Sequence, residues 1–241
     1  MIIKRNNHSL VEVACSIWFD PIFNDWDSTY FGKFYEKIKE LGYNQKEEKK
    51  VIEIHIDDTN QDVDGMPIPQ TKSSEMRMIF RNSENNAAIM LSNNLISFNK
   101  LTPYNGWDDL MDKIVNPCLK IYEEIGLGKG IIQVSALYLN KFTIPMNEKL
   151  VNYFNFIPVI EGIGEVSDRS LEFQTHYDID SNLELILKLN GGTNYQKNNK
   201  EVFFECVCIA KNINGISTTG ELSELAHQKA RSAFIQLTNT K

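Results

Sequence analysis

The sequence predicts an α+β protein in which two similar halves, residues 1–127 and 128–241, pack tightly as one globular unit. Many short segments alternate apolar and polar side chains with a period of two, which is typical of antiparallel strands with one buried face. Other segments repeat their apolar residues at helical spacing. Because the order strand, helix, several strands, helix occurs twice, we expect one long antiparallel sheet with helices on one face.

The first half begins with a predicted strand over 11–19, in which every second residue is apolar. An apolar stripe followed by Gly42 predicts a helix over 26–41, since glycine readily ends a helix. A second helix is predicted over 105–125, and Pro117 should kink it because proline removes an intrahelical hydrogen bond. The remaining segments are predicted as strands over 51–57, 76–80, 87–91 and 95–98, with an acidic loop over 58–74.

The second half repeats this order. Its predicted elements are a strand over 131–142, a short helix over 147–156, strands over 171–179, 183–189 and 202–210 with a polar loop over 190–200, and a final helix capped by Thr218 or Thr219. The first predicted strands of the two halves align at an offset of 121 residues, Val11 with Ile132 and Val13 with Val134. Such an alignment is expected after an ancient duplication. Two such β-α-β(3-4)-α pseudo-repeats match TATA-box-binding-protein-like and helix-grip-like folds, in which the sheet face opposite the helices stays open.

Composition and charge exclude several classes of protein. With 42% hydrophobic residues, the chain is too apolar to be disordered. Its formal net charge is −7, and its basic residues are 20 Lys and only 5 Arg. Because arginine is the better clamp for phosphates and guanine edges, nucleic-acid binding is disfavoured. The sequence shows neither an apolar signal segment nor an apolar run of about 20 residues, so we expect a cytoplasmic protein without membrane association.

Motifs for catalysis or metal binding are scarce. Cys15, Cys206 and Cys208 lie in apolar strand-like runs, which favours buried thiols over a zinc or redox site. Alternating oxygen-bearing residues before Gly65 imitate the first half of a calcium loop, but its twelfth position is Thr71, where such a loop needs glutamate. We therefore expect no metal, no cofactor, and an exposed acidic loop at this place.

Five residues are candidates for binding on the open face of the sheet. Trp18 points away from the predicted helices, so its exposure would favour a protein partner. Arg77 and Arg81 are the arginines that a nucleic-acid interface on this face would need. His55 and His176 fall on comparable strands of the two halves, and with neighbouring carboxylates they could act as acid and base if they converge.

The final helix carries a pair of polar residues, His227 and Arg231, one turn apart. This pair could bind an anion or a partner, although a plain exposed face is the simpler interpretation. Trp107 opens the second predicted helix on its apolar side and is interpreted as a core anchor rather than a stacking platform.

Short motifs in this chain resemble a family of prokaryotic proteins. They are Tyr104-x-x-Trp107 before the second helix, Tyr138-x-Asn140 in the strand that opens the second half, and His227, Phe234 and Thr238 in the last helix. Together with Glu12 in the opening strand, they are similar to the family described as "sporadically distributed", which has no established activity. Leu137 stands where the family pattern has arginine, so a role of that arginine does not transfer. The patchy distribution of the family resembles that of phage-defence and mobile-element genes, which implies a role in antiviral defence.

Three functions are compatible with these observations. We favour a non-enzymatic protein-binding or scaffold protein, acting on a protein partner or as a homodimer, because no motif is specific for catalysis. The first alternative is a small-molecule or nucleotide sensor, which requires a cavity of several hundred Å³ near Phe34, Tyr138 or Phe204. The second alternative is a hydrolase, which requires His55 and His176 to meet at one substrate.

Overall fold

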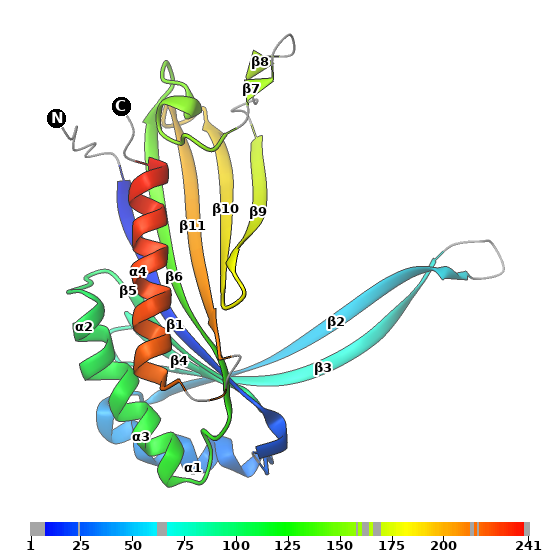
Figure 1. Ribbon diagram of the computed structural model, residues 1–241, viewed down its shortest axis with the longest axis vertical. Coiled ribbons are helices and arrows are strands. Elements are labelled where there is room, and N and C mark those ends of the chain that lie inside the picture. The colour runs from blue at the N-terminus through cyan, green and yellow to red at the C-terminus, as the bar shows by residue number, and fades with distance from the viewer. Residues whose placement is uncertain are drawn as a thin grey trace.

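A computed structural model describes residues 8–23, 25–61, 67–157, 159–160, 164–165, 170–212, 215 and 217–238. For 8, 23, 51–61, 67–74, 159–160 and 164–165 it describes the backbone only. Its main element is a nine-stranded antiparallel sheet with the order β2-β3-β4-β5-β1-β6-β11-β10-β9 (Figure 1). The first half supplies β1 (His8–Phe19), β2 (Gln45–Gln61), β3 (Pro67–Arg81), β4 (Ala87–Leu91) and β5 (Leu95–Leu101). The second half supplies β6 (Ile131–Pro145), β9 (Ser170–Asp180), β10 (Leu183–Asn194) and β11 (Asn199–Lys211), and β7 (Val159–Ile160) pairs separately with β8 (Gly164–Glu165).

The two halves meet at the centre of the sheet, where β1 pairs antiparallel with β6. The other strands of the first half continue the sheet beyond β1, and those of the second half continue it beyond β6. In each half the last strand lies beside the first, so the strands follow the same relative order. The α+β class and the long antiparallel sheet predicted from the sequence are confirmed.

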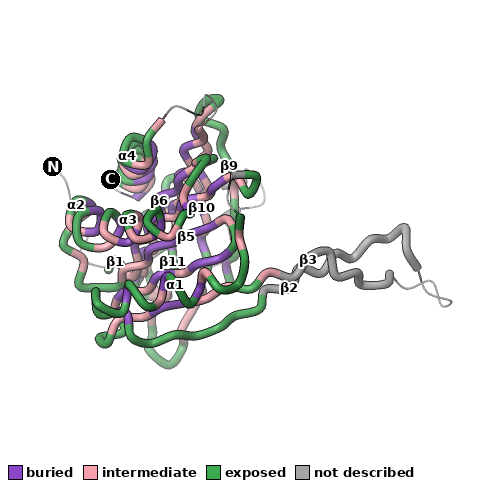
Figure 2. The backbone as a smooth tube through the Cα atoms, turned by 90° about the horizontal axis from the view of Figure 1, so that it is seen from below, coloured by how far each residue is buried: buried purple, intermediate pink, exposed green. Residues whose placement is uncertain are grey.

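The helices pack on one face of this sheet (Figure 1). In the first half they are η1 (Pro21–Phe23), α1 (Thr29–Ile38), η2 (Lys39–Leu41), α2 (Trp107–Leu110), η3 (Met111–Val115) and α3 (Asn116–Glu124). In the second half they are η4 (Leu150–Asn152) and α4 (Thr219–Thr238). Figure 2 shows buried residues along the strands and on the inner sides of the helices, because the core lies between these two layers.

Aromatic side chains hold the helices on the sheet. Under α4, the ring of Phe204 stacks on Phe234 at 5.8 Å, and Phe142 meets Phe154 edge-to-face at 4.8 Å. Under α1, the buried Phe34 lies against Phe80. Such ring pairs contribute about 0.5–1.5 kcal/mol each beyond the burial of their area. These ring contacts fix the position of α4 over β6 and β11. The site described below lies where α4 meets β6.

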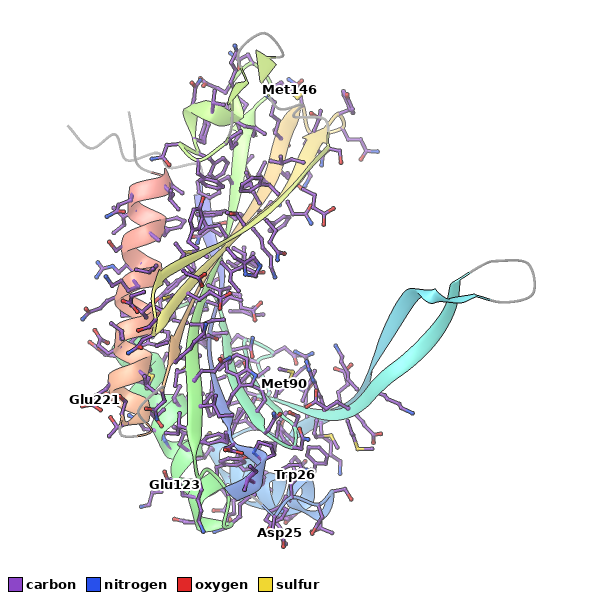
Figure 3. The ribbon with its side chains drawn as sticks, turned by 45° about the vertical axis from the view of Figure 1, so that its right-hand side comes forward. Asp25, Trp26, Met90, Glu123, Met146 and Glu221 are labelled. Carbon is purple, nitrogen blue, oxygen red and sulfur yellow. The ribbon has the colours of Figure 1, made fainter. Side chains whose placement is uncertain are left out.

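The opposite face of the sheet is not covered by any described helix. Met90 of β4 lies on this open face (Figure 3). Beyond the body of the sheet, β2 and β3 continue as a two-stranded ribbon that projects to the side (Figure 1). Only 78–81 of β3 also pair with β4. The predicted acidic loop over 58–74 is therefore wrong for 58–61 and 67–74, which belong to β2 and β3, because backbone pairing extends into a polar sequence that has no hydrophobic alternation.

Two helix predictions needed correction. The helix expected over 147–156 is a single 3₁₀ turn, because Asn155 donates its backbone N–H to the Leu237 carbonyl and its side-chain amide to the Gln236 carbonyl. These bonds tie the segment to the end of α4 instead of continuing a helix. The single helix expected over 105–125 is divided into α2, the π-helical turn η3 and α3, and Pro117 lies in the first turn of α3.

The N-terminus of α4 is closed by reciprocal hydrogen bonds, as in a capping box. The Thr218 backbone N–H donates to Glu221 Oε2 at 2.8 Å, and the Glu221 backbone N–H donates to Thr218 Oγ1 at 3.2 Å (Glu221 is labelled in Figure 3). We expect Thr218→Ala to lower the free energy of unfolding by about 1 kcal/mol, because the Glu221 backbone N–H loses its acceptor, Thr218 Oγ1. Urea unfolding of the variant beside Thr219→Ala measures this, and equal effects of the two substitutions would contradict the assignment of Thr218 as the cap.

Candidate functional site

A pocket of about 550 Å³ lies where α2 and α4 meet the two central strands. Its walls combine aromatic and aliphatic side chains with a few polar groups. The lining residues are Leu10 of β1, Tyr104 and Gly106 of the turn before α2, Trp107 and Asp108 of α2, Tyr138 and Asn140 of β6, and His227, Arg231, Phe234 and Ile235 of α4. Pockets of this volume and composition are typical of small-molecule sites.

Local structure places each of these side chains. Tyr138 and Asn140 are two residues apart on β6, so both point toward the helices, and Asn140 is only 3% exposed. On α4, His227 and Arg231 lie one turn apart, and Phe234 continues the same side of the helix. Gly106 has φ +123°, a conformation that side chains disfavour, and it turns the chain into α2.

The centre of the pocket is a stack of three rings. The Trp107 indole lies parallel to the His227 imidazole, with 4.7 Å between centroids and 5° between planes. Tyr138 lies beside both rings, and its hydroxyl is 2.5 Å from His227 Nδ1. One residue from α2, one from β6 and one from α4 are thus locked together. Trp107 is 5% exposed, so the core position predicted for it is confirmed, but it is also a wall of the pocket.

The protonation state of this stack follows from its burial. Burial lowers the pKa of His227 below its ordinary 6.5, and the Arg231 guanidinium acts in the same direction against the opposing carboxylates of Glu224 and Asp108. Burial also raises the pKa of Tyr138 far above its usual range. The hydrogen bond between the Tyr138 hydroxyl and His227 Nδ1 therefore joins a protonated phenol to a neutral imidazole at neutral pH.

The lowered pKa of His227 predicts a dependence of stability on pH. Because the unfolded chain binds this proton more tightly than the folded one, stability is fully present above about pH 6.5 and falls as the pH falls through the pKa of the folded state. We expect the free energy of unfolding of the wild type to decline between about pH 6.5 and 5, and that of His227→Phe to decline less. Urea titrations across this interval measure both slopes, and equal slopes would contradict the prediction. The other histidines are present in both proteins and cancel in the comparison.

Two hydrogen-bond donors are buried in the pocket wall without an acceptor. The Trp107 indole Nε1 and the Tyr104 hydroxyl oxygen are both closed to water and have no hydrogen-bond partner among the residues that the structure describes. The Tyr104 hydroxyl neighbours that of Tyr138, which tends to lower the pKa of Tyr104 against the larger effect of burial, but their geometry falls short of a hydrogen bond. An unpaired buried donor costs about 1–3 kcal/mol. Away from this pocket, Ser92 Oγ, the Tyr122 hydroxyl and Asn199 Oδ1 are also buried without a hydrogen-bond partner among the described residues.

Two charged residues stand at the rim of the pocket. Arg231 is exposed and forms no ion pair with any described residue, and Asp108 at the start of α2 is exposed as well. The pair His227 and Arg231, interpreted from the sequence as a plain exposed face, therefore lines a shaped site.

The five binding residues predicted on the open face lie away from the pocket between α2 and α4. Trp18 is half-buried between Leu95 of β5 and Gln133 of β6. Arg77 pairs with Glu75 at 2.7 Å, and Arg81 pairs with Glu47 at 3.3 Å. Arg81 also borders a small pocket of about 240 Å³ with Glu12, which accepts a hydrogen bond from Asn99. None of these residues reaches the pocket between α2 and α4.

The proposed meeting of His55 and His176 is wrong. His55 belongs to β2 and His176 to β9, which are the two opposite edges of the sheet with seven strands between them. His176 is exposed and lies 2.9 Å from Glu184 through Nδ1. The side chain of His55 lies outside the described part of the chain. A shared acid–base site of the two histidines within one chain is thereby excluded.

The remaining motifs give no further site. All four cysteines are buried and free, and burial raises the pKa of the Cys15 thiol to about 12. Within the described ranges, no group of three or more His, Cys, Asp or Glu side chains could hold a metal ion. Residues 62–66 of the calcium-like segment lie outside the described residues. No helix in the part of the chain that the structure describes is long and apolar enough to cross a membrane.

Comparison with known proteins finds no family model and no curated protein that matches the chain. The residues that carry the resemblance noted from the sequence nevertheless share one place in the structure. Six of them line the pocket, namely Tyr104, Trp107, Tyr138, Asn140, His227 and Phe234. Glu12 and Leu137 instead lie on the open face of β1 and β6. The sequence signal that could have located the pocket was therefore this set of motifs, taken together and not one by one.

Proposed function

We propose that the chain is a non-enzymatic binding protein that holds a small molecule in the pocket between α2 and α4. The observation that carries this proposal is the pocket itself, with a volume of about 550 Å³. Its walls are mainly aromatic and aliphatic side chains with a few polar groups, which is the composition of small-molecule sites.

The chemistry of the lining supports binding rather than catalysis. Its residues include no serine, threonine or cysteine that could serve as a nucleophile. His227, the one histidine in the lining, is held by the Tyr138 hydroxyl and not by a carboxylate. The aromatic walls and the few polar groups instead suit recognition of a molecule that is apolar at one end and polar at the other.

Native mass spectrometry of the protein purified from cells tests this proposal. We expect the wild type to carry an additional mass of a few hundred daltons, which the variant Ile235→Trp loses because the larger ring fills the mouth of the pocket. Ile235 is 46% exposed, so the substitution leaves the core intact. Leu225→Trp is the matched control, since Leu225 is another exposed apolar residue of α4 but does not line the pocket.

An additional mass that is unchanged in Ile235→Trp would place the ligand elsewhere and overturn the proposal. A bare wild-type chain that also shows no change in Tm with any member of a broad metabolite library would overturn it as well. Circular dichroism of both tryptophan variants ensures that loss of the ligand is compared between folded proteins.

The open face of the sheet favours a second candidate function, the binding of a protein partner or of a second copy. Leu137, Val207 and Ile186 are adjacent on β6, β11 and β10 and are only partly buried there. A contiguous apolar row without a covering layer is typical of interaction surfaces. Sedimentation analysis of the wild type and of Leu137→Glu tests this candidate, which requires an assembly that the charged substitution disrupts.

A further inference from the structure

A second pocket lies on the open face of the sheet. It has a volume of about 240 Å³ and is lined by side chains from β1, β5, β4 and β3. In one cross-strand row, Ala88 of β4 lies between Asn99 of β5 and Arg81 of β3. Because alanine is much smaller than either neighbour, the row is hollowed at its middle. Met90 and Leu101 form apolar walls beside this hollow (Met90 is labelled in Figure 3).

The carboxylate of Glu12 belongs to this pocket and is held in a fixed orientation. The Asn99 side-chain amide donates to Glu12 Oε1 at 2.5 Å, and the Ser97 hydroxyl donates to Asn99 Oδ1 at 3.1 Å. Ser97 is only 3% exposed, so it determines which end of the Asn99 amide faces Glu12. A carboxylate offers roughly four acceptor positions, so most of those on Glu12 remain open.

Glu12 is partly buried and forms no ion pair with any residue that the structure describes. Arg81, the other charged residue of the lining, donates instead to Glu47 of β2 at 3.3 Å. Since three strand spacings separate β1 from β3, the backbones of Glu12 and Arg81 are about 14 Å apart. On the other side of β1, Lys141 of β6 pairs with Glu201 at 3.2 Å. The end of the pocket at Glu12 therefore carries an uncompensated negative charge.

We infer that this pocket binds a primary ammonium group on a short apolar chain, with the ammonium at Glu12 and the chain against Met90 and Leu101. An ammonium group only donates hydrogen bonds, which suits a carboxylate with open acceptor positions. Charge-assisted hydrogen bonds of this kind are about twice as strong as neutral ones. The group could come from a free amine or from a lysine side chain of a polypeptide. This site lies on the opposite face of the sheet from the pocket between α2 and α4 and does not depend on the function proposed for that pocket.

Three probes test the ligand class: butylammonium, the uncharged 1-butanol, and Nα-acetyl-lysine methylamide. We expect butylammonium to bind at least about tenfold more tightly than 1-butanol at neutral pH, which corresponds to about 1.4 kcal/mol. The readout is the side-chain amide resonance of Asn99, identified as the one that is missing in Asn99→Ala. Because this amide donates to Glu12, an ammonium on the same carboxylate should shift it.

Two variants separate the charge of the site from its shape. Glu12→Gln should abolish the preference for butylammonium, since it removes the charge and keeps an acceptor for Asn99. Glu205→Gln is the matched control and should preserve the preference, because Glu205 pairs with Lys188 at 3.0 Å and does not line the pocket. Ala88→Leu should abolish binding of butylammonium with Glu12 intact, because the larger side chain fills the hollow. This variant distinguishes the pocket from diffuse attraction of cations to a chain with a net charge of −7.

The outcomes that would overturn the inference are distinct. They are equal binding of butylammonium and 1-butanol, a preference that persists in Glu12→Gln, binding that is unchanged in Ala88→Leu, and no shift with any probe. Circular dichroism checks that the variants are folded, and Ala88→Leu decides the matter if Glu12→Gln is not. Tighter binding of the lysine derivative than of butylammonium would support a polypeptide as the source, and the reverse would support a free amine. The function proposed for the other pocket is decided separately, by the mass of the protein purified from cells.

Discussion

Replacement of Trp107 by alanine is expected to lower the free energy of unfolding by about 3–5 kcal/mol, the range for large aromatic residues in a core. The indole is 5% exposed, stacks on His227 at 4.7 Å and lies against Tyr138. Its removal leaves a cavity at the point where α2, β6 and α4 meet. Urea unfolding followed by circular dichroism measures the loss, and retention of wild-type stability would show that this stack does not hold the helices.

Trp107→Phe separates the ring contact of this residue from its polar group. Phenylalanine keeps an aromatic ring against His227 but lacks the indole N–H, which has no partner among the described residues. We therefore expect a much smaller loss of stability than in Trp107→Ala. Equal losses in the two variants would show that the ring contact does not stabilise this junction.

Gly191→Ala is expected to cost about 3 kcal/mol or more, because overpacking and backbone strain act together. Gly191 lies in the β10–β11 hairpin with φ +152°, opposite Val202. A Cβ atom there would stand 2.2 Å from the Glu201 carbonyl oxygen and 2.8 Å from the Val202 Cα. Both neighbours are backbone atoms, so the strands themselves would have to move apart.

Gly42→Ala is the matched control for this prediction. Gly42 has φ +91°, but a Cβ atom would meet nothing within 4 Å. The control therefore carries only the cost of a left-handed conformation, about 1–2 kcal/mol. Urea unfolding of the two variants compares strain alone with strain plus collision. Equal losses in both would show that the hairpin relaxes without cost, contrary to the expectation.

The sequence predicted those parts of the fold that a local pattern encodes. The alternation in 87–91 predicts β4 with its observed bounds, and the apolar stripe with the Thr218 cap predicts α4. The strands predicted over 51–57 and 76–80 lie within β2 and β3, but the strand residues between them were predicted as a loop because their polar sequence has no hydrophobic alternation. The helix over 147–156 was wrong because Asn155 bonds to the end of α4, a contact that no local pattern contains.

The candidate site was harder to predict for the same reason. The helical position of Trp107 predicts a buried residue, and the position of His227 on its own helix predicts an exposed one. Only the packing of α4 over β6 brings the imidazole onto the indole and under the Tyr138 hydroxyl. The open-face residues Trp18 and Arg81 were predicted as binding residues from their residue types. Residue type alone does not indicate which side chains converge in the fold.

The central pairing of β1 with β6 gives the pocket a mechanical property. Leu10, Tyr104 and Trp107 come from the first half of the chain, and Tyr138 and His227 come from the second. A molecule held between them acts as a removable cross-link. At a ligand concentration one hundred times its Kd, binding to the folded chain alone adds about 2.7 kcal/mol to the free energy needed to pull the two halves apart. An occupied pocket would then make the whole nine-stranded sheet more resistant to deformation, including the strands far from the pocket.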